Sequence, residues 1–473
     1  MINIYLKEQI KENFQYEPTS EQEEVLKLLI NFLLSPAENE VFILRGYAGT
    51  GKTSLVSAIV KTWNKFNKEL LLLAPTGRAA KVFSSYAQHV ANTIHRVIYR
   101  QEGNFLENGN FELGYNRHKE TVFFVDEASM IANQDSSLSP FGSGRLLEDL
   151  IHFVFSGKKC KLILLGDQAQ LPPVGSENSV ALNKEFIEGF GLTVHEYDMR
   201  QVVRQELESG ILWNATQIRY LIAKEDTTHF PQITTKNFSD IKVIDGIEMM
   251  DDLATAYSRD GLDETVIVCR SNFAANLYNQ GVRNRILFRE DELNTGDSLM
   301  VVRNNYFWKD SQAGIDFLAN GELITIERIK NIYSLYDFKF AEVTISLPNY
   351  DKVELDVILL LDTLHTKTAS LSQEDYNKLF QHITADYANL KTKKELIDKL
   401  KANEHLNALQ VKYAYAITCH KAQGGQWKSV FIDHGGIRKE NIGSQYYKWL
   451  YTAITRATEH VYLINFPKEF EDD

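Results

Sequence analysis

The sequence predicts an α/β protein with two parallel-sheet layers, of which only the first carries a phosphate-binding loop. A buried strand, a glycine-rich loop and an apolar-faced helix follow one another between Val41 and Val60. Strand-like apolar runs near residues 41, 70, 121, 162 and 193 alternate with helical stretches, which is typical of a parallel sheet. A second strand-rich block starts at Glu264, resumes at Val411 and contains no further loop of this kind.

Composition indicates a globular chain that works in a reducing compartment. The 473 residues are 44% hydrophobic and 24% charged, and no apolar run reaches membrane-spanning length, so no membrane contact is expected. The start shows no signal-peptide layout, and Cys160, Cys269 and Cys419 are scattered in apolar stretches. These features predict free thiols and a cytoplasmic location. The net charge of −12 argues mildly against a protein coated in nucleic acid but permits a local basic channel.

The first chemical motif is GYAGTGKT, which spans Gly46 to Thr53. Its G-x-x-x-x-G-K-T spacing between a strand and a helix is that of a P-loop, in which backbone N–H groups surround phosphate oxygens. Lys52 is expected to reach the outer phosphates and Thr53 to hold Mg²⁺. The motif therefore predicts ATP and Mg²⁺ as cofactors, bound by Gly46, Ala48, Gly49, Thr50, Gly51, Lys52 and Thr53.

The segment TVFFVDEASM places two carboxylates at the end of a buried strand. Asp126 can hold the magnesium ion through water, and Glu127 can orient or deprotonate an attacking water. A solvated strand end is the plain alternative, but pairing with the P-loop favours the catalytic interpretation.

The segment KLILLGDQAQLPPVG adds another buried strand that ends in a polar tip. Gln168 is expected to sense the γ-phosphate, and Pro172 and Pro173 stiffen the loop that follows. A proline-braced surface turn is the alternative.

The second layer contributes an arginine within YTAITRATEH. Arg456 lies among small and β-branched residues that look buried, so its guanidinium is expected to point at a fixed anion. An arginine from a second sheet can complete an ATP site on the first by stabilising the γ-phosphate. Arg204, in MRQVVRQELESGI, is a candidate for a second such contact.

Together these stretches resemble the superfamily 1 helicases, in the 5′→3′ branch that contains RecD-like and Dda-like DNA helicases. The matching stretches, in order, are TSEQEEVL, GYAGTGKT, APTGRAAKVF, NTIHRVIY, VDEASM, GDQAQLPPVG, VVRQELESGI, GDSLMVVRNNY, AITCHKAQGGQW and YTAITRA. They cover nearly the whole chain, and their order makes the combined match specific.

The resemblance implies a domain organisation. It implies a first RecA-like domain over 1–198 with a β-hairpin insert at 98–120, and a second RecA-like domain over 199–303 and 411–473. A small SH3-like barrel with a helical arm is expected to fill 304–410, with helices near Gln373–Tyr387 and Thr392–Ala402. Asn108 and Gly109 give the hairpin a strong turn signal. The family carries a strand-separating pin here, although a harmless surface hairpin is the alternative.

The resemblance also implies residue roles. Gln22 is expected to bond the adenine, and Gln168, Arg204 and Arg456 to surround the γ-phosphate. Gln426 departs from the pattern, since many relatives have a ribose-contacting glutamate there. Single-stranded DNA is expected to meet Pro75, Thr76, Arg78, Lys81, His95, Phe105, Phe111, Pro172, Pro173, Thr418, His420 and Lys421. His95 has a purely structural role as its alternative.

The sequence therefore predicts a monomeric, DNA-stimulated ATPase that translocates 5′→3′ on single-stranded DNA and unwinds forked duplex. Its polarity follows from the resemblance alone. A translocase that remodels protein–DNA or RNA complexes without processive unwinding is the alternative, and a nucleotide-controlled binding module is a more distant one. A single-strand-binding protein or a replication or repair factor would be a fitting partner.

Overall fold

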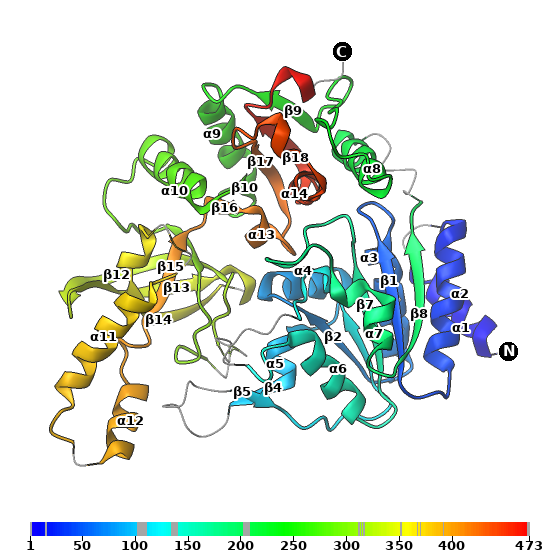
Figure 1. The fold of residues 1–473 in the computed structure, drawn as a ribbon, viewed down its shortest axis with the longest axis horizontal. Helices are drawn as coiled ribbons and strands as arrows, with labels where there is room; N and C mark the ends of the chain where they lie inside the picture. Colours follow the sequence, from blue (N-terminus) through cyan, green and yellow to red (C-terminus); the bar gives the residue numbers. More distant parts are fainter. Residues whose placement is uncertain are drawn as a thin grey trace.

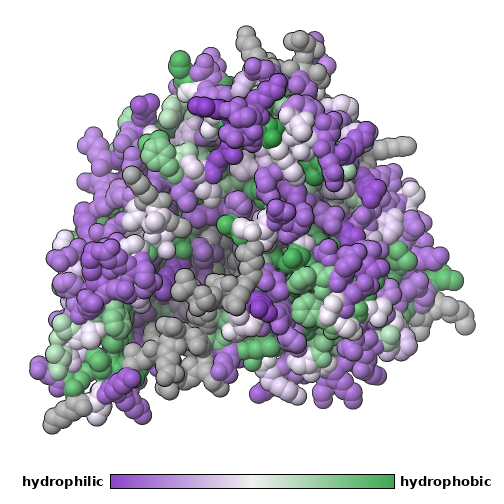
Figure 2. Space-filling view, viewed as in Figure 1, coloured by the Kyte–Doolittle hydropathy of each residue, from purple (hydrophilic) through white to green (hydrophobic). Residues whose placement is uncertain are grey.

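A computed structural model describes most of the chain. The described residues are 2–14, 17–101, 111–133, 141–201, 209–310, 313, 315, 317–350, 352–366, 368, 370–390 and 392–470. Within these ranges, no helix combines the length and the apolar character that crossing a membrane requires. Hydrophilic side chains cover most of the face shown in Figure 2, and hydrophobic ones are scattered over it.

The N-terminal unit is built on a six-stranded parallel sheet in the order β3-β2-β6-β7-β1-β8. Its strands are β1 (Glu40–Gly46), β2 (Leu70–Ala74), β3 (Ala91–Thr93), β6 (Val122–Val125), β7 (Lys161–Gly166) and β8 (Thr193–Met199). The central strands are apolar without alternation because helices cover both faces of the sheet. Those helices are α1 (Ile2–Lys11), α2 (Ser20–Leu34), α3 (Lys52–Lys65), α4 (Gly77–Ala87), α5 (Ile94–Ile98), α6 (Leu146–Ser156), α7 (Lys184–Glu188) and the short η1 (Ala128–Met130).

A second parallel sheet has the strand order β16-β10-β17-β18-β9. Its strands are β9 (Ile241–Ile244), β10 (Thr265–Cys269), β16 (Ala416–Thr418), β17 (Trp427–Asp433) and β18 (Ala457–Ile464). The helices around it are α8 (Gly210–Ala223), α9 (Met249–Asp260), α10 (Asn272–Gly281), the π-helical turn η4 (Val282–Ile286), α13 (Cys419–Ala422) and α14 (Ser444–Ile454). Figure 1 shows this sheet stacked above the first, with α13 and α14 towards the first.

A closed barrel of five strands is inserted into the second sheet's chain. Its strands are β11 (Ser298–Val301), β12 (Leu323–Leu335), β13 (Phe338–Leu347), β14 (Val353–Leu360) and β15 (Leu409–Tyr413), and η5 (Pro348–Tyr350) joins two of them. The arm helices are α11 (Gln373–Asp386) and α12 (Lys393–Lys401), which project beside the barrel (Figure 1). The predicted fold class, two parallel sheets with a small barrel, is confirmed. The barrel extends beyond the expected insert at 304–410. Its first strand, β11, precedes that range, and its last strand, β15, runs past the end of it.

The expected hairpin insert is represented by its base. β4 (Tyr99–Gln101) pairs with β5 (Phe111–Leu113) in antiparallel register. Residues 102–110 are outside the described part of the chain, so Phe105 and the Asn108–Gly109 turn remain predictions.

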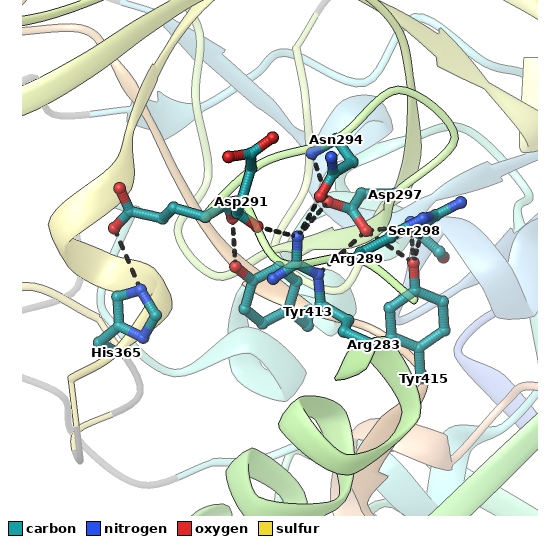
Figure 3. Close-up of polar contacts among 10 residues, drawn as sticks. Arg283, Arg289, Asp291, Asn294, Asp297, Ser298, His365, Tyr413 and Tyr415 are labelled. Atoms are coloured by element: carbon teal, nitrogen blue, oxygen red, sulfur yellow. Dashed lines mark hydrogen bonds and ion pairs between the residues drawn. The ribbon is translucent and has the colours of Figure 1, made fainter. Parts of the chain in front are cut away.

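A buried charge cluster joins the barrel to the second sheet (Figure 3). Asp297, which is fully buried, accepts hydrogen bonds from Arg283 at 3.1 and 3.2 Å, Arg289 at 2.7 Å and Tyr415 at 2.9 Å. The backbone N–H of Asn294 donates to the same carboxylate at 2.8 Å. Arg283 lies on η4, whereas the carboxylate directly precedes β11 and Tyr415 follows β15. The Asp297 carboxylate therefore links the segment that enters the barrel before β11 to the segment that leaves it after β15.

We expect Asp297→Asn to lower the free energy of unfolding by about 3–5 kcal/mol, because the neutral amide leaves the buried Arg283 and the half-buried Arg289 guanidinium groups without their anion. Urea denaturation followed by tryptophan fluorescence measures this loss. Asp356→Asn is the matched control, since that exposed barrel carboxylate pairs with Lys330 at the surface and its removal is expected to cost less than about 1 kcal/mol. Equal losses in the two variants would contradict the structural role of the cluster.

Candidate nucleotide site and nucleic-acid interface

The phosphate loop connects β1 to α3 at the carboxyl edge of the first sheet. Gly49 and Gly51 have φ of 75° and 72°, which side chains with a Cβ rarely adopt, and a Cβ at Gly46 would lie 3.0 Å from Thr50 Oγ1. α3 starts at Lys52, whose Nζ donates to the Gly46 carbonyl at 3.3 Å. The loop and the N-terminus of α3 thus form a cradle of backbone donors with an amine folded over it, which suits a phosphate chain.

Gln22 packs beneath this loop. Its Nε2 donates to the Thr50 carbonyl at 3.2 Å, and its Oε1 accepts from Thr19 N at 2.9 Å in the capping box that begins α2. The side chain is buried, so its amide ties the start of α2 to the P-loop. The expected contact of Gln22 with adenine remains a prediction.

The acidic pair follows β6, which β7 separates from the P-loop strand β1. Asp126 accepts hydrogen bonds from the Tyr86 hydroxyl on α4 and from Glu127 N at 2.8 Å, which fixes the orientation of its carboxylate. Glu127 has a left-handed φ of 51°. Its Oε2 atom is shielded from solvent and has no hydrogen-bond partner in the described structure. Burial raises the pKa of Glu127, with Arg456 and Lys52 acting in the opposite direction.

Arg456 reaches this pair from the second sheet. Its Nη1 lies 3.9 Å from Glu127 Oε1, and only 4% of the residue is exposed. The guanidinium also donates to the carbonyls of Thr452 at 3.0 Å and Gly425 at 3.3 Å, and to Thr455 Oγ1 at 3.2 Å. The arginine is therefore held in place by its own unit while its charge faces the Glu127 carboxylate of the other.

A third carboxylate, Asp167 after β7, is buried between the two units. Its Oδ2 accepts a hydrogen bond from the Tyr451 hydroxyl at 2.6 Å, and its Oδ1 accepts from Ala169 N at 2.8 Å. Burial raises its pKa, and Lys52 opposes that shift most strongly. Lys52 and Arg456 both act on Asp167 and Glu127, so two cations and two acids occupy one buried site.

The loop after β7 places its two glutamines differently. Gln168 is exposed and Gln170 is buried, with its Oε1 atom lacking a partner in the described structure. Leu171 N donates to Thr452 Oγ1 at 2.8 Å, and Gln423 Nε2 donates to the Leu171 carbonyl at 2.7 Å. Side chains of the second unit therefore hydrogen-bond the backbone of this loop on both sides of Leu171.

Three of the residues expected at DNA contact other protein groups. Thr76 Oγ1 accepts from Ala79 N at 3.2 Å as the cap of α4, and Lys81 Nζ donates to the Pro348 carbonyl of the barrel at 2.8 Å. Arg78 Nη2 donates to the Gln426 carbonyl at 3.0 Å, and its guanidinium lies 3.5 Å from the ring centre of Trp427. Burial lowers the pKa of Arg78 to about 10. This arginine therefore joins the two units.

His95 and Phe111 belong to an aromatic cluster at the hairpin base. The His95 ring lies 4.7 Å from Phe141, and burial lowers its pKa to about 4, so it is neutral at physiological pH. Phe111 lies 4.9 Å from Phe141 and 4.3 Å from Tyr306 between ring centres. The structure thus places Phe111, an expected DNA contact, in the packed base of the hairpin, and gives His95 the structural surroundings that were its alternative.

The remaining expected DNA residues lie on the second layer and the proline loop. Thr418 is the N-cap residue of α13, but its hydroxyl makes no capping hydrogen bond. His420 is exposed, and burial lowers the pKa of Lys421. Thr418 ends β16, and His420 and Lys421 follow it, much as Thr76 follows β2, so the two sheets present similar strand ends. Pro75 and Pro173 are half-buried, whereas Pro172 is buried.

The positive-φ glycine of the AQGGQW segment packs against the first unit. A Cβ at Gly424 would lie 2.7 Å from Ala79 Cβ, and one at Gly425 would lie 2.5 Å from Arg78 Nε. The close approach that these glycines permit is therefore between protein units. Gln426 itself is exposed, and only its backbone carbonyl has a contact in the described structure, with Arg78.

Some residues of this site were not predicted from the sequence. The expected Arg204 lies outside the described residues. Tyr86, Gln170 and Tyr451 contact or adjoin the acidic groups but were not singled out. Tyr451 opens the YTAITRA stretch that also contains Arg456, so the same stretch offered a signal. A polar residue that lies five positions before a buried arginine, across a helix end, is a candidate for the same site.

Comparisons with known proteins agree with this geometry. Residues 19–220 match the model of an AAA domain, and residues 413–464 match that of a UvrD-like helicase C-terminal domain. An uncharacterised protein, R530, of Acanthamoeba polyphaga mimivirus is 21% identical over 89% of this chain and 95% of its own length.

Two characterised proteins are also similar. The ATP-dependent RecD2 DNA helicase of Deinococcus radiodurans is 30% identical over 29% of this chain and 17% of that protein. The Pif1 helicase from Bacteroides, solved in complex with ADP-AlF3 and single-stranded DNA, shares the fold with a TM-score of 0.50 and 16% identity over 97% of this chain and 95% of that chain. With a phosphate loop on one sheet, a buried arginine from the other and both models matched in order, this chain is similar to the superfamily 1 helicases of the 5′→3′ branch, and it is an ATP-hydrolysing helicase.

Proposed function

We propose that this helicase translocates 5′→3′ on single-stranded DNA and unwinds forked duplex, powered by ATP bound between its two parallel sheets. The observation that carries the proposal is the 3.9 Å contact between Arg456 of the second sheet and Glu127 of the first. A site assembled from two units can couple the state of the nucleotide to their separation. The polarity comes from the resemblance to the 5′→3′ branch.

ATP would lie in the loop from Gly46 to Thr53, with Lys52 on the outer phosphates. Glu127 would orient the attacking water, and Arg456 would move from its carboxylate onto the γ-phosphoryl oxygens as negative charge grows there. The unpartnered Oε2 of Glu127 fits a role as an acceptor for that water. Gln426, near the interface, stays a candidate for the ribose, and Arg204 for a further cation.

The donor set at the loop also fits Mg²⁺. Thr53 follows Lys52 with an exposed side chain, and the oriented Asp126 carboxylate can accept from metal-bound water. When bound, the ion would neutralise charge on the phosphate oxygens. No donor outside this loop and strand end is needed for that role.

We assign the γ-phosphate sensor to Gln170 in place of Gln168. An amide offers a donor and an acceptor, so it can donate to a phosphoryl oxygen and accept from the water beside it. Gln170 is buried and has a free acceptor, whereas Gln168 is exposed to solvent. A buried dipole stabilises developing charge more strongly than an exposed one does.

Single-stranded DNA would cross the matching strand ends of the two sheets. Thr76 and Thr418 can contact phosphates there, with Lys421 and His420 adding polar contacts. Arg78 and Lys81 would serve mainly to hold the units together, because both are bonded to protein. Unwinding at the hairpin would use its tip, and Phe111 would stabilise its base.

Lys52→Ala is expected to reduce ATP turnover at least ~100-fold, because the amine over the phosphates is lost. ATPase rates of the parent and the variant, each with and without oligo-dT, test this expectation. Strong stimulation by oligo-dT is expected only in the parent. A parent chain that oligo-dT does not stimulate would contradict the motor, and strand-separation assays on DNA and RNA forks distinguish unwinding from remodelling.

The two glutamines give a matched pair for a second test. Gln170→Ala is expected to lower kcat for ATP by ~100-fold, since it removes a positioned group at the γ-phosphate. Gln168→Ala, two residues away on the surface, is expected to change kcat by less than about 2-fold. The reverse order of effects in steady-state ATPase assays would return the role to Gln168.

A further inference from the structure

Helix α14 belongs to the second sheet's unit but carries a row of contacts into the first. Tyr451 and Thr452 lie in its last turn, and Arg456 follows two residues after its end. Thr452 meets Leu171 N, Arg456 meets Glu127, and Tyr451 meets both Ala48 and Asp167. A single helix end thus contacts the phosphate loop and the ends of two neighbouring strands.

The hydroxyl of Tyr451 lies at the centre of this row. It accepts a hydrogen bond from Ala48 N at 2.9 Å and donates one to Asp167 Oδ2 at 2.6 Å. A backbone N–H can only donate, so the hydroxyl accepts from Ala48, and its single proton is available to Asp167. The phosphate loop, the second unit and the β7 strand end are therefore linked through one oxygen atom.

Filling the space at this position does not require the hydroxyl of Tyr451. Tyr451 is fully buried, where a polar atom is costly unless it is bonded, and phenylalanine would fill the same space. Both of its partners belong to the opposite unit. Tyr447, one turn earlier and also fully buried, donates instead to the His229 carbonyl within its own unit at 2.8 Å. Of these two buried tyrosines on one helix, Tyr451 bonds across the interface between the units, and Tyr447 bonds within its own unit.

We propose that Tyr451 is a positioning residue of the ATP site, which couples the conformation of the phosphate loop to the placement of Arg456 by holding Ala48 and Asp167 against α14. This inference rests on the proposed ATP-driven function. The coupling follows from connectivity: a nucleotide that shifts the Ala48 backbone moves the Tyr451 hydroxyl, and the rigid helix end transmits that shift to Arg456.

Loss of the hydroxyl leaves the other parts of the site in place. Lys52 keeps its contact with Gly46, and Arg456 keeps its bonds to Thr452, Gly425 and Thr455. Nucleotide binding to the loop should therefore persist, while the arrangement of the two units around the phosphates becomes less defined. A defect of this kind appears in kcat and leaves KM almost unchanged.

The test compares Tyr451→Phe with the parent and with Tyr447→Phe as the matched control. At saturating oligo-dT, kcat for ATP in Tyr451→Phe is expected to fall ~10-fold, while KM and the Kd of a fluorescent ATP analogue stay within about 3-fold. Tyr447→Phe is expected to keep kcat within about 2-fold of the parent. Retained analogue binding also shows that each variant is folded.

Three results overturn the inference: an unchanged kcat in Tyr451→Phe, a loss of analogue affinity as large as the loss of kcat, or an equal loss of kcat in Tyr447→Phe. Each of these requires a parent that hydrolyses ATP, so each leaves the proposed function standing. A parent with no oligo-dT-stimulated hydrolysis overturns the proposed function and this inference together.

Discussion

The structure depends on bringing a carboxylate and a guanidinium from two separate sheets into one buried space. Burying the Glu127 carboxylate without a positive partner would cost free energy, and its raised pKa reflects that desolvation cost. Arg456 offsets part of that cost from 3.9 Å. Arg456 therefore stabilises the charge of Glu127 only while the second unit lies against the first.

The rest of the inter-unit surface supports this arrangement with contacts of modest individual strength. Arg78 stacks on Trp427, the Gly424–Gly425 pair lets backbone approach α4, and Lys81 binds the barrel. Ala169 and Leu171 of the first unit also join the buried apolar cluster of the second, so the interface combines polar contacts with a shared hydrophobic core.

Sequence reasoning found the parts that have short local signatures and missed those that depend on packing. The strands, the P-loop and the Asp126–Glu127 pair follow from apolar runs with polar ends, and the last two meet because parallel strands share one edge. Arg456, which directly precedes β18 of the other sheet, was expected at the site from its small and β-branched neighbours. Spacing alone could not show that Gln170 is buried and Gln168 exposed, the difference on which the proposed sensor rests. Nor could it show that Arg78 stacks on a ring 349 positions away, that Phe111 lies in a cluster, or that β11 and β15 close the barrel. Those facts are set by long-range contacts.

The barrel and the second sheet share one continuous hydrophobic core, which includes Ile267 and Phe431 from the sheet and Ile324 and Val343 from the barrel. An inserted domain usually has a core of its own and can be exchanged as a module. Here excision between Ser298 and Ala414 would strip an apolar face from the sheet, although the two ends are bonded to each other at 3.0 Å. Amide hydrogen exchange should accordingly find β10, β13 and β17 opening in a single cooperative unit.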